Sequence, residues 1–210
     1  KQKTAYEIGV RLVGSEMCIR DRPFCFINVF NFKIMNFPIL SSLILLPTVG
    51  ALFLLFSKDK NSNTSKNVAL FTSFVNFLIS IYLWYLFDSS TSSFQFVEDR
   101  EWLKGFINYK VGIDGVSILF IILTTLITPL CIISVNNTIK NRLRDFLIAI
   151  LLMESLMIGV FCSLDLVVFY LFFEAGLIPM FLIIGIWGGE RRVYSAFKFF
   201  LYTLLGSVLM

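Results

Sequence analysis

The chain has 210 residues, of which 57% are hydrophobic and only 15% charged, and its formal net charge is +4. Soluble domains usually contain about 25% charged residues, and the mean hydropathy of +0.82 lies on the apolar side of them. This composition predicts a protein that lies in the lipid bilayer, and the small positive charge gives no indication of nucleic-acid binding. The chain contains no histidine, which excludes His-based zinc sites, His-ligated haem and Ser-His-Asp or Cys-His catalysis.

Residues 1–34 differ in composition from the rest of the chain. The run from Arg11 to Arg22, RLVGSEMCIRDR, resembles translated sequencing-adapter sequence. The region has neither the apolar core of a signal peptide nor the serine-rich, acid-poor character of a transit peptide. We predict that 1–34 is a non-native extension and that Met35 is the native start, with the origin of 23–34 left open.

From Met35 onward, long apolar runs are separated by shorter polar stretches. None of the runs alternates in polarity with period two, so the pattern favours membrane-spanning helices over barrel strands. We predict an all-α, polytopic transmembrane bundle of about six helices. Their ranges are 38–57, 67–87, 113–135, 145–162, 165–187 and 195–210. The last run is shorter than the roughly 20 residues that a span requires, which predicts a truncated chain.

Lysine and arginine are concentrated in alternate loops. Nine of them follow the first, third and fifth predicted helices: Lys58, Lys60, Lys66, Lys140, Arg142, Arg144, Arg191, Arg192 and Lys198. The long loop 89–112 has only Arg100, Lys104 and Lys110. By the positive-inside rule the nine residues face the cytoplasm or the mitochondrial matrix, and the native N-terminus and loop 89–112 face outward.

A single carboxylate, Glu174, lies well inside the apolar run 165–187. It comes nine residues after Asp165, which at about 1.5 Å per residue places it roughly 13 Å into a hydrocarbon layer about 30 Å thick. A charge at that depth costs about 2.5 to 3.5 kcal/mol by insertion scales, so such a group faces protein or water, or is protonated. We therefore interpret Glu174 as a functional residue.

Glu154 is a second carboxylate inside an apolar run. Glu154 lies before the turn at Ser163, and Glu174 lies after that turn by about the same number of residues. Consecutive antiparallel helices would therefore place both carboxylates at similar depth. If they face each other, the two carboxylates form a proton relay; the alternative is that Glu154 is a single polar group bonded to a neighbouring helix. Lys198 has two interpretations as well: snorkelling to the interface, or electrostatic attraction of Glu174 from a neighbouring helix.

Other polar residues have structural explanations. Asp114 and Asp165 each stand at the start of a predicted helix, where a carboxylate caps the free amides. The four cysteines have no CxxC spacing. The sequence contains no glycine-rich phosphate loop, no metal-ligand cluster and no nucleophile with a base, so we expect no cofactor and no metal within this chain.

Four motifs in the same order carry a resemblance to a known family. They are VGIDGVS around Asp114, MESLMIGVF around Glu154, FFEAGLIPM around Glu174 with Trp187-Gly after it, and YSAFKFFLYT around Lys198. Together, from about 35 to 210, they resemble the antiporter-like subunit M, or mitochondrial subunit 4, of proton-pumping NADH:quinone oxidoreductase, respiratory complex I. The FFEAGLIPM run is the specific element, because it separates this subunit from its siblings and from cation/proton antiporters.

The resemblance implies a fourteen-helix antiporter-like fold with two inverted five-helix repeats. Residues 35–143 would supply helices one to three with the outer loop 89–112, and 144–210 would supply the start of the first repeat: helices four, five and part of six. Glu174 would be the helix-five glutamate that pairs with a lysine of helix seven in the proton channel. That lysine is not Lys198, and it would lie beyond Met210.

The same resemblance implies a membrane subunit of a translocase, which takes part in proton translocation coupled to electron transfer from NADH to quinone. Its partners would be other membrane subunits of complex I, in a bacterial or mitochondrial inner membrane. No redox centre would lie in this chain; NADH, FMN, iron–sulfur clusters and quinone would belong to partner subunits. The alternatives are a subunit of a multisubunit sodium/proton antiporter and a structural membrane scaffold.

Overall fold

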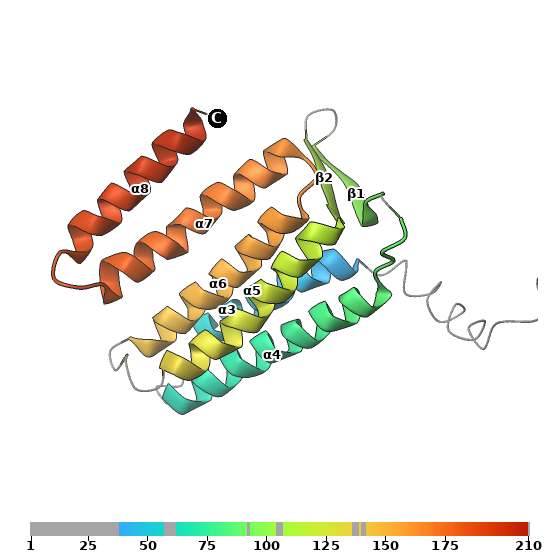
Figure 1. Ribbon diagram of the computed structural model, residues 1–210. Helices are drawn as coiled ribbons and strands as arrows, with labels where there is room; N and C mark the ends of the chain where they lie inside the picture. Colours follow the sequence, from blue (N-terminus) through green and yellow to red (C-terminus); the bar gives the residue numbers. More distant parts are fainter. Residues whose placement is uncertain are drawn as a thin grey trace, which may run out of the picture. The chain divides into compact units, whose positions relative to one another are not determined.

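The computed structural model describes residues 38–56, 62–91, 93–103, 107–135, 139 and 142–209. Six helices and a two-stranded sheet lie within these ranges (Figure 1). The helices are α3 (Ile39–Phe56), α4 (Ser62–Leu86), α5 (Gly115–Ser134), α6 (Leu143–Cys162), α7 (Leu166–Trp187) and α8 (Arg192–Val208). The strands are β1 (Gln95–Leu103) and β2 (Ile107–Ile113). The predicted extension 1–34 lies outside the described residues.

The six helices confirm the predicted transmembrane bundle, and five of them, α3 to α7, are long and apolar enough to cross a membrane. Most of their ends fall within two residues of the predicted ends; α4 differs, because it begins at Ser62 rather than at 67. The first turn of α4 is polar, so the apolar pattern did not include it. α8 has 17 residues.

The stretch 89–112, predicted as a loop, contains an antiparallel hairpin instead. Arg100 pairs with Tyr109 and Asp99 with Lys110, which places an acid opposite a base. The sequence of β2 alternates apolar Ile107, Tyr109, Val111 and Ile113 with Asn108, Lys110 and Gly112, and such period-two alternation is the pattern of a half-buried strand. The predicted all-α membrane bundle is confirmed, and the predicted outer loop contains a two-stranded hairpin in addition.

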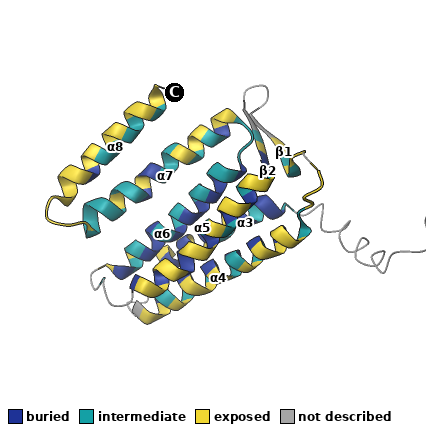
Figure 2. Cartoon of the chain, in the orientation of Figure 1, coloured by how far each residue is buried: buried dark blue, intermediate teal, exposed yellow. Residues whose placement is uncertain are grey.

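Among the described elements, α6 is the most widely contacted helix. It packs against α3, α4, α5 and α7, while α8 packs against α7 (Figure 1). A cluster of buried residues joins α3, α4, α5 and α6: Ala51, Leu54, Ala69, Ile132, Val135, Leu143, Leu147, Ile148 and Leu151. Figure 2 shows α6 buried or partly buried along most of its length and α8 largely exposed.

Much of the exposed surface of the helices is apolar. On α4, Phe71 and Tyr85 are 69% and 73% exposed, and on α8 Leu201 and Tyr202 are 60% and 78% exposed. Large side chains of this kind are favourable next to lipid and costly next to water. The exposure pattern thus agrees with a bundle that is surrounded by lipid and by further membrane helices.

Two predicted helix caps are present. The side chain of Asp114 accepts a hydrogen bond from the backbone N–H of Ser117 at 2.7 Å, at the start of α5. The side chain of Asp165 accepts one from the backbone N–H of Val167 at 2.9 Å, at the start of α7. Such bonds satisfy amides that have no partner within the helix. Each of these two helices contains a proline in its interior: Pro129 lies within α5 and Pro179 within α7.

Candidate functional site

Glu174 lies within α7 and is bonded to α8. Eight residues of α7 precede it, so it lies about 12 Å along the axis from the start of the helix. Its side chain is half-buried. The hydroxyl of Ser207, near the end of α8, donates a hydrogen bond to Oε1 of Glu174. The same Ser207 hydroxyl lies 3.0 Å from the carbonyl oxygen of Leu204 in its own helix.

Ser207 can therefore form a hydrogen bond with Glu174 in both the ionised and the protonated state of the carboxyl group. A serine hydroxyl has one proton to donate and lone pairs that accept. When Glu174 is ionised, Ser207 donates to it. When Glu174 is protonated, its O–H can donate to Ser207 Oγ while the serine proton turns to the Leu204 carbonyl. The carboxyl group keeps a hydrogen-bond partner in both states, which suits a group that gains and loses a proton within a membrane.

Glu154, on α6, is bonded to a different helix. Its side chain is buried, with 2% of the residue exposed. Nδ2 of Asn76, on α4, donates a hydrogen bond to Oε1 of Glu154 at 2.8 Å. Asn76 is itself fully buried. This contact agrees with the interpretation of Glu154 as a polar group that joins two helices.

Two further hydrogen bonds join helices of the bundle, and each involves a residue that lies near Asn76 or Glu154 in the sequence. The hydroxyl of Ser155 donates to the carbonyl oxygen of Ile44 on α3 at 2.6 Å. The hydroxyls of Ser80 on α4 and Thr125 on α5 lie 2.8 Å apart. Hydrogen bonds between buried polar side chains hold membrane helices together at specific positions. Glu154 thus belongs to a set of polar contacts among α3, α4, α5 and α6.

The two carboxylates are equally far from the turn between their helices but have separate partners. Glu154 precedes the α6 C-cap Ser163 by nine residues, and Glu174 follows the α7 N-cap Asp165 by nine. Their partner helices differ, because α4 supplies Asn76 and α8 supplies Ser207. Figure 1 shows α7 between α6 and α8. Within the described residues the structure therefore brings each glutamate to an amide or a hydroxyl of another helix.

Lys198 is exposed on α8. It precedes Ser207 by nine residues on the same helix, which separates the two by about 13 Å along the axis and by about half a turn around it. The group next to Glu174 is thus the Ser207 hydroxyl, while the ammonium of Lys198 points from another face of α8. The exposed position agrees with a side chain that reaches the membrane interface.

Asn76 and Ser207 were not singled out from the sequence. Asn76 stands in the apolar run Phe-Val-Asn-Phe-Leu, and an amide inside a predicted span is a usable signal, because it requires a partner there. Ser207 carries no such signal, since a serine hydroxyl is commonly satisfied by its own helix. Its partner could be found only by placing α8 against α7.

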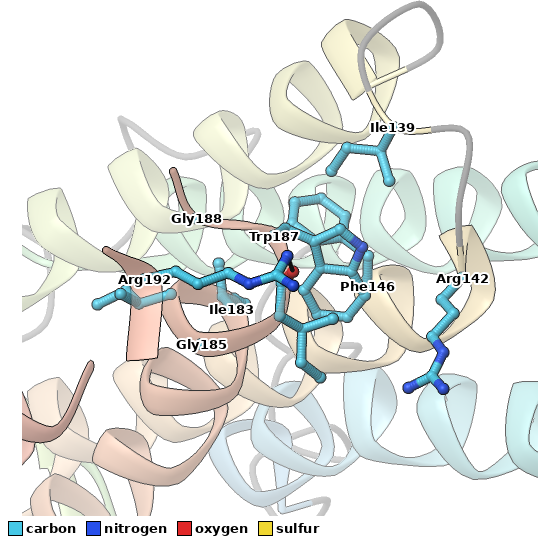
Figure 3. Close-up of a pocket in the computed structure, with 10 residues that line it drawn as sticks. Ile139, Arg142, Phe146, Ile183, Gly185, Trp187, Gly188 and Arg192 are labelled. Atoms are coloured by element: carbon cyan, nitrogen blue, oxygen red, sulfur yellow. Dashed lines mark hydrogen bonds between the residues drawn. The ribbon is translucent and has the colours of Figure 1, made fainter. Parts of the chain in front are cut away.

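A cavity in the described part of the chain is lined by neither glutamate. It has a volume of about 1200 Å³ and lies near the start of α6, the end of α7 and the start of α8. In Figure 3 the rings of Phe146 and Trp187 lie between Arg142 and Arg192. The rings meet edge to face with centroids 5.1 Å apart, and Nη1 of Arg192 donates to the carbonyl oxygen of Ile186 at 2.8 Å. Ile183, the lining residue of α7 that is nearest to Glu174 in sequence, lies nine residues beyond it, so the cavity begins about 13 Å from Glu174 along α7.

In the part of the chain that the structure describes, no three His, Cys, Asp or Glu side chains come together as a candidate metal site. Cys162 is buried, and Cys131 is an exposed free cysteine on α5.

Comparisons with known proteins agree with the sequence motifs. Residues 163–210 match a family model described as NADH:quinone oxidoreductase/Mrp antiporter, TM. The chain is 59% identical over 152 residues to NADH-quinone oxidoreductase subunit M of Rhodobacter capsulatus. The aligned stretch covers 72% of this chain and 29% of that protein. It is 46% identical over 173 residues to NADH-ubiquinone oxidoreductase chain 4 of Marchantia polymorpha, which covers 81% of this chain and 35% of that protein.

A solved structure shares the fold. A chain of the membrane-bound sulfane sulfur reductase, an archaeal respiratory membrane complex, matches with a TM-score of 0.63 over 79% of this chain and 25% of that chain. The sequence identity is 16%, so this likeness concerns the fold alone. The present chain spans about a third of the length of the curated relatives that it matches. Over the matched residues, the chain belongs to the family of NADH-quinone oxidoreductase subunit M and NADH-ubiquinone oxidoreductase chain 4.

Proposed function

We propose that this chain is part of a membrane subunit of NADH:quinone oxidoreductase, complex I, and that it takes part in proton translocation coupled to electron transfer from NADH to quinone. The observation that carries the proposal is Glu174, a carboxyl group inside an apolar span whose hydroxyl partner can both donate and accept. A carboxyl group at that depth is costly. A partner that suits both protonation states lowers the cost of changing between them.

In this proposal Glu174 is the residue that changes its protonation state. Proton uptake by Glu174 would be matched by rotation of the Ser207 proton toward the Leu204 carbonyl, and proton release by rotation back. The resemblance adds a lysine on a later helix as the group that alternately approaches and leaves Glu174. An approaching cation favours the ionised carboxylate, and its withdrawal favours the protonated form.

The proposal assigns the redox steps to partner subunits. NADH, FMN, the iron–sulfur clusters and the quinone would be bound by them, as the resemblance implies. The other partners would be neighbouring membrane subunits of the complex, against the exposed apolar faces of the bundle. The protein would lie in a bacterial or mitochondrial inner membrane, with the native N-terminus and the hairpin β1–β2 on the outer side, because most basic residues belong to the loops at the other end.

The test is Glu174→Gln in the full-length subunit assembled in its complex. Proton pumping by inverted vesicles should fall by at least about tenfold, because positioned proton-transfer groups typically contribute about a hundredfold or more. The amount of assembled complex should stay unchanged, since glutamine keeps the size and a hydrogen bond to Ser207. Glu190→Gln is the matched control, because Glu190 lies in the exposed turn between α7 and α8. Unchanged pumping in Glu174→Gln would contradict the proposal.

A sodium/proton antiporter subunit is the second candidate, because the matching family model covers both kinds of protein. The two functions can be distinguished by the energy source that drives proton movement. In vesicles that lack the redox partner subunits, an antiporter exchanges protons for sodium when a sodium gradient is imposed, whereas the proposed subunit does not. The two relatives described above are both named as oxidoreductase subunits, which supports the first function.

A further inference from the structure

Two buried oxygen atoms in the Asn76–Glu154 contact have no hydrogen-bond partner. Nδ2 of Asn76 donates to Oε1 of Glu154 at 2.8 Å. The other oxygen of each side chain, Oδ1 of Asn76 and Oε2 of Glu154, is buried and unbonded. Both residues are almost completely inaccessible, with 0% and 2% exposed. The two unbonded atoms thus belong to the same two side chains that already share one hydrogen bond.

The ionised form of Glu154 cannot satisfy these atoms. A carboxylate and an amide carbonyl are both acceptors, so neither can donate to the other. A buried acceptor without a donor costs about 1 to 3 kcal/mol, and more when it is charged. The neutral carboxylic acid has one O–H. It can donate to Oδ1 of Asn76, which closes a ring of two hydrogen bonds and removes both unbonded atoms at once.

No described cation lies where it would stabilise the ionised form. The elements that pack against α6 are α3, α4, α5, α7 and β2. Their titratable or charged residues with described side chains are Lys66, Tyr82, Tyr85, Tyr109, Lys110, Cys131, Tyr170 and Glu174. Lys66 is ten residues from Asn76 along α4, about 15 Å. Arg144, on α6 itself, is ten residues from Glu154 and equally far along the helix.

The other nearby lysine is at the far end of α6. The backbone carbonyl of Lys110 accepts from the N–H of Leu164, and Leu164 lies ten residues beyond Glu154, also about 15 Å along a helix. Glu174, the acid on a neighbouring helix, would oppose a second negative charge. Hydrogen bonding, burial and charge all favour the neutral form of Glu154.

We infer that Asn76 and Glu154 form a closed acid–amide pair in which Glu154 holds its proton permanently. The pair is a positioning device that joins α4 to α6: Asn76 offers the neutral acid both a donor and an acceptor, and burial disfavours the charged form of Glu154. Glu154 then adds no charge near Glu174 and is not a stage in a two-carboxylate relay. This inference concerns the pair alone and stands whether or not the proposed function of Glu174 holds.

The experiment is infrared spectroscopy of the full-length subunit in its purified complex. A protonated carboxyl group has a carbonyl stretching band that a carboxylate lacks. The difference spectrum between the unmodified protein and Glu154→Gln should contain this band at neutral and at mildly alkaline pH. In Asn76→Leu the band should shift to higher frequency, because the Glu154 carbonyl loses the donor Nδ2. Asp145→Asn is the control, since Asp145 is on the same helix and its side chain is 49% exposed.

Conservative rescue provides the second readout. Glutamine has an N–H in place of the acid O–H, so Glu154→Gln can form both hydrogen bonds of the ring. We expect it to assemble and to unfold at the same temperature as the unmodified protein, while Glu154→Leu loses stability. The inference is overturned if Glu154→Gln removes no carboxylic-acid band, or if it loses as much stability as Glu154→Leu. If Asn76→Leu does not assemble, the Glu154→Gln spectrum decides alone.

Discussion

Glu98 of strand β1 accepts a hydrogen bond from the backbone N–H of Leu40, at 3.0 Å, in the first turn of α3. The hydroxyl of Ser41 donates to the other carboxylate oxygen, and its Oγ lies 3.3 Å from the hydroxyl of Tyr109 on β2. The first amides of a helix have no partner within the helix, and its N-terminus favours negative charge. The hairpin therefore supplies the cap of α3.

Replacing Glu98 should weaken this end of the bundle. Glu98→Ala removes the acceptor for the Leu40 amide and the Ser41 hydroxyl, and we expect the free energy of unfolding in detergent to fall by about 1 to 2 kcal/mol. Asp99→Ala is the control, because Asp99 is exposed and pairs with Lys110 across the hairpin. It should cost at most about 0.5 kcal/mol. Equal losses in the two variants would show that the cap contributes nothing specific.

Asp114 makes the cap of α5 sensitive to acid. Hydrogen bonds from Ser117, its hydroxyl first and its backbone N–H second, lower the pKa of Asp114 below the usual 3.8. Because the folded pKa is the lower one, the carboxylate stabilises the protein fully above the unfolded pKa and loses this effect as the pH falls through the folded pKa. The cap should thus weaken only in strong acid.

The variant Asp114→Asn isolates the contribution of the Asp114 charge to stability. Asparagine also caps, but it lacks the charge that interacts with the helix dipole, so at neutral pH the variant should be less stable by about 0.3 to 1 kcal/mol. Unfolding of both proteins is followed as the pH is lowered from neutral to about 2. The difference in free energy should shrink once the pH falls below the pKa of the unfolded state and disappear below the lower pKa of the folded state. A difference that stays constant with pH would contradict the role of the charge.

The spans could be predicted from the sequence because burial in lipid imposes a local requirement. An apolar run long enough to cross the bilayer must be helical, since its backbone groups have no other partners there. Asp114 and Asp165 could be placed as caps for the same reason: their bonds go to amides two or three residues away. Each of these predictions depends on neighbours in the chain.

The contacts that define the site depend on distant residues and could not be predicted. The hairpin acquires its position by pairing β1 with β2 and by the bond from Leu164 to Lys110, which joins it to the turn between α6 and α7. Asn76 and Glu154 are 78 residues apart. The apolar pattern identifies Glu174 as unusual, but it does not show which helix supplies the hydroxyl beside it.

Gly159 allows α6 and α7 to approach closely. A Cβ added at this position would lie 2.6 Å from Cδ1 of Phe172 on α7. Gly159→Ala should therefore destabilise the bundle by about 1 to 3 kcal/mol through overpacking. Gly176→Ala is the matched control, since a Cβ there meets nothing within 4 Å, and alanine should be neutral or should stabilise the helix by up to about 1 kcal/mol.

A second-site variant tests whether contact with Phe172 causes the loss of stability in Gly159→Ala. Phe172→Ala in the Gly159→Ala background removes the ring that the new methyl group meets, so the two changes should be less harmful together than the sum of their separate effects. Thermal unfolding in detergent measures all four proteins. Additive losses, or equal losses for Gly159→Ala and Gly176→Ala, would contradict close packing at Gly159.

The orientation of the bundle can be tested with two exposed positions. Thr91 follows α4 and Glu190 follows α7, and three helices, α5, α6 and α7, lie between them in the chain. If each of these helices crosses the membrane, the two positions are on opposite sides. The excess of basic residues at the Glu190 end places that end in the cytoplasm or matrix.

Thr91→Cys and Glu190→Cys are made separately in a full-length protein whose native cysteines, including Cys131 and Cys162, are replaced by serine. In sealed vesicles whose outer face is exposed, a membrane-impermeant thiol reagent should label Thr91→Cys at once. It should label Glu190→Cys only after the membrane is permeabilised, and the order should reverse in inverted vesicles. Labelling of both variants from one side would exclude three crossings, and the opposite order would show that the basic loops face outward.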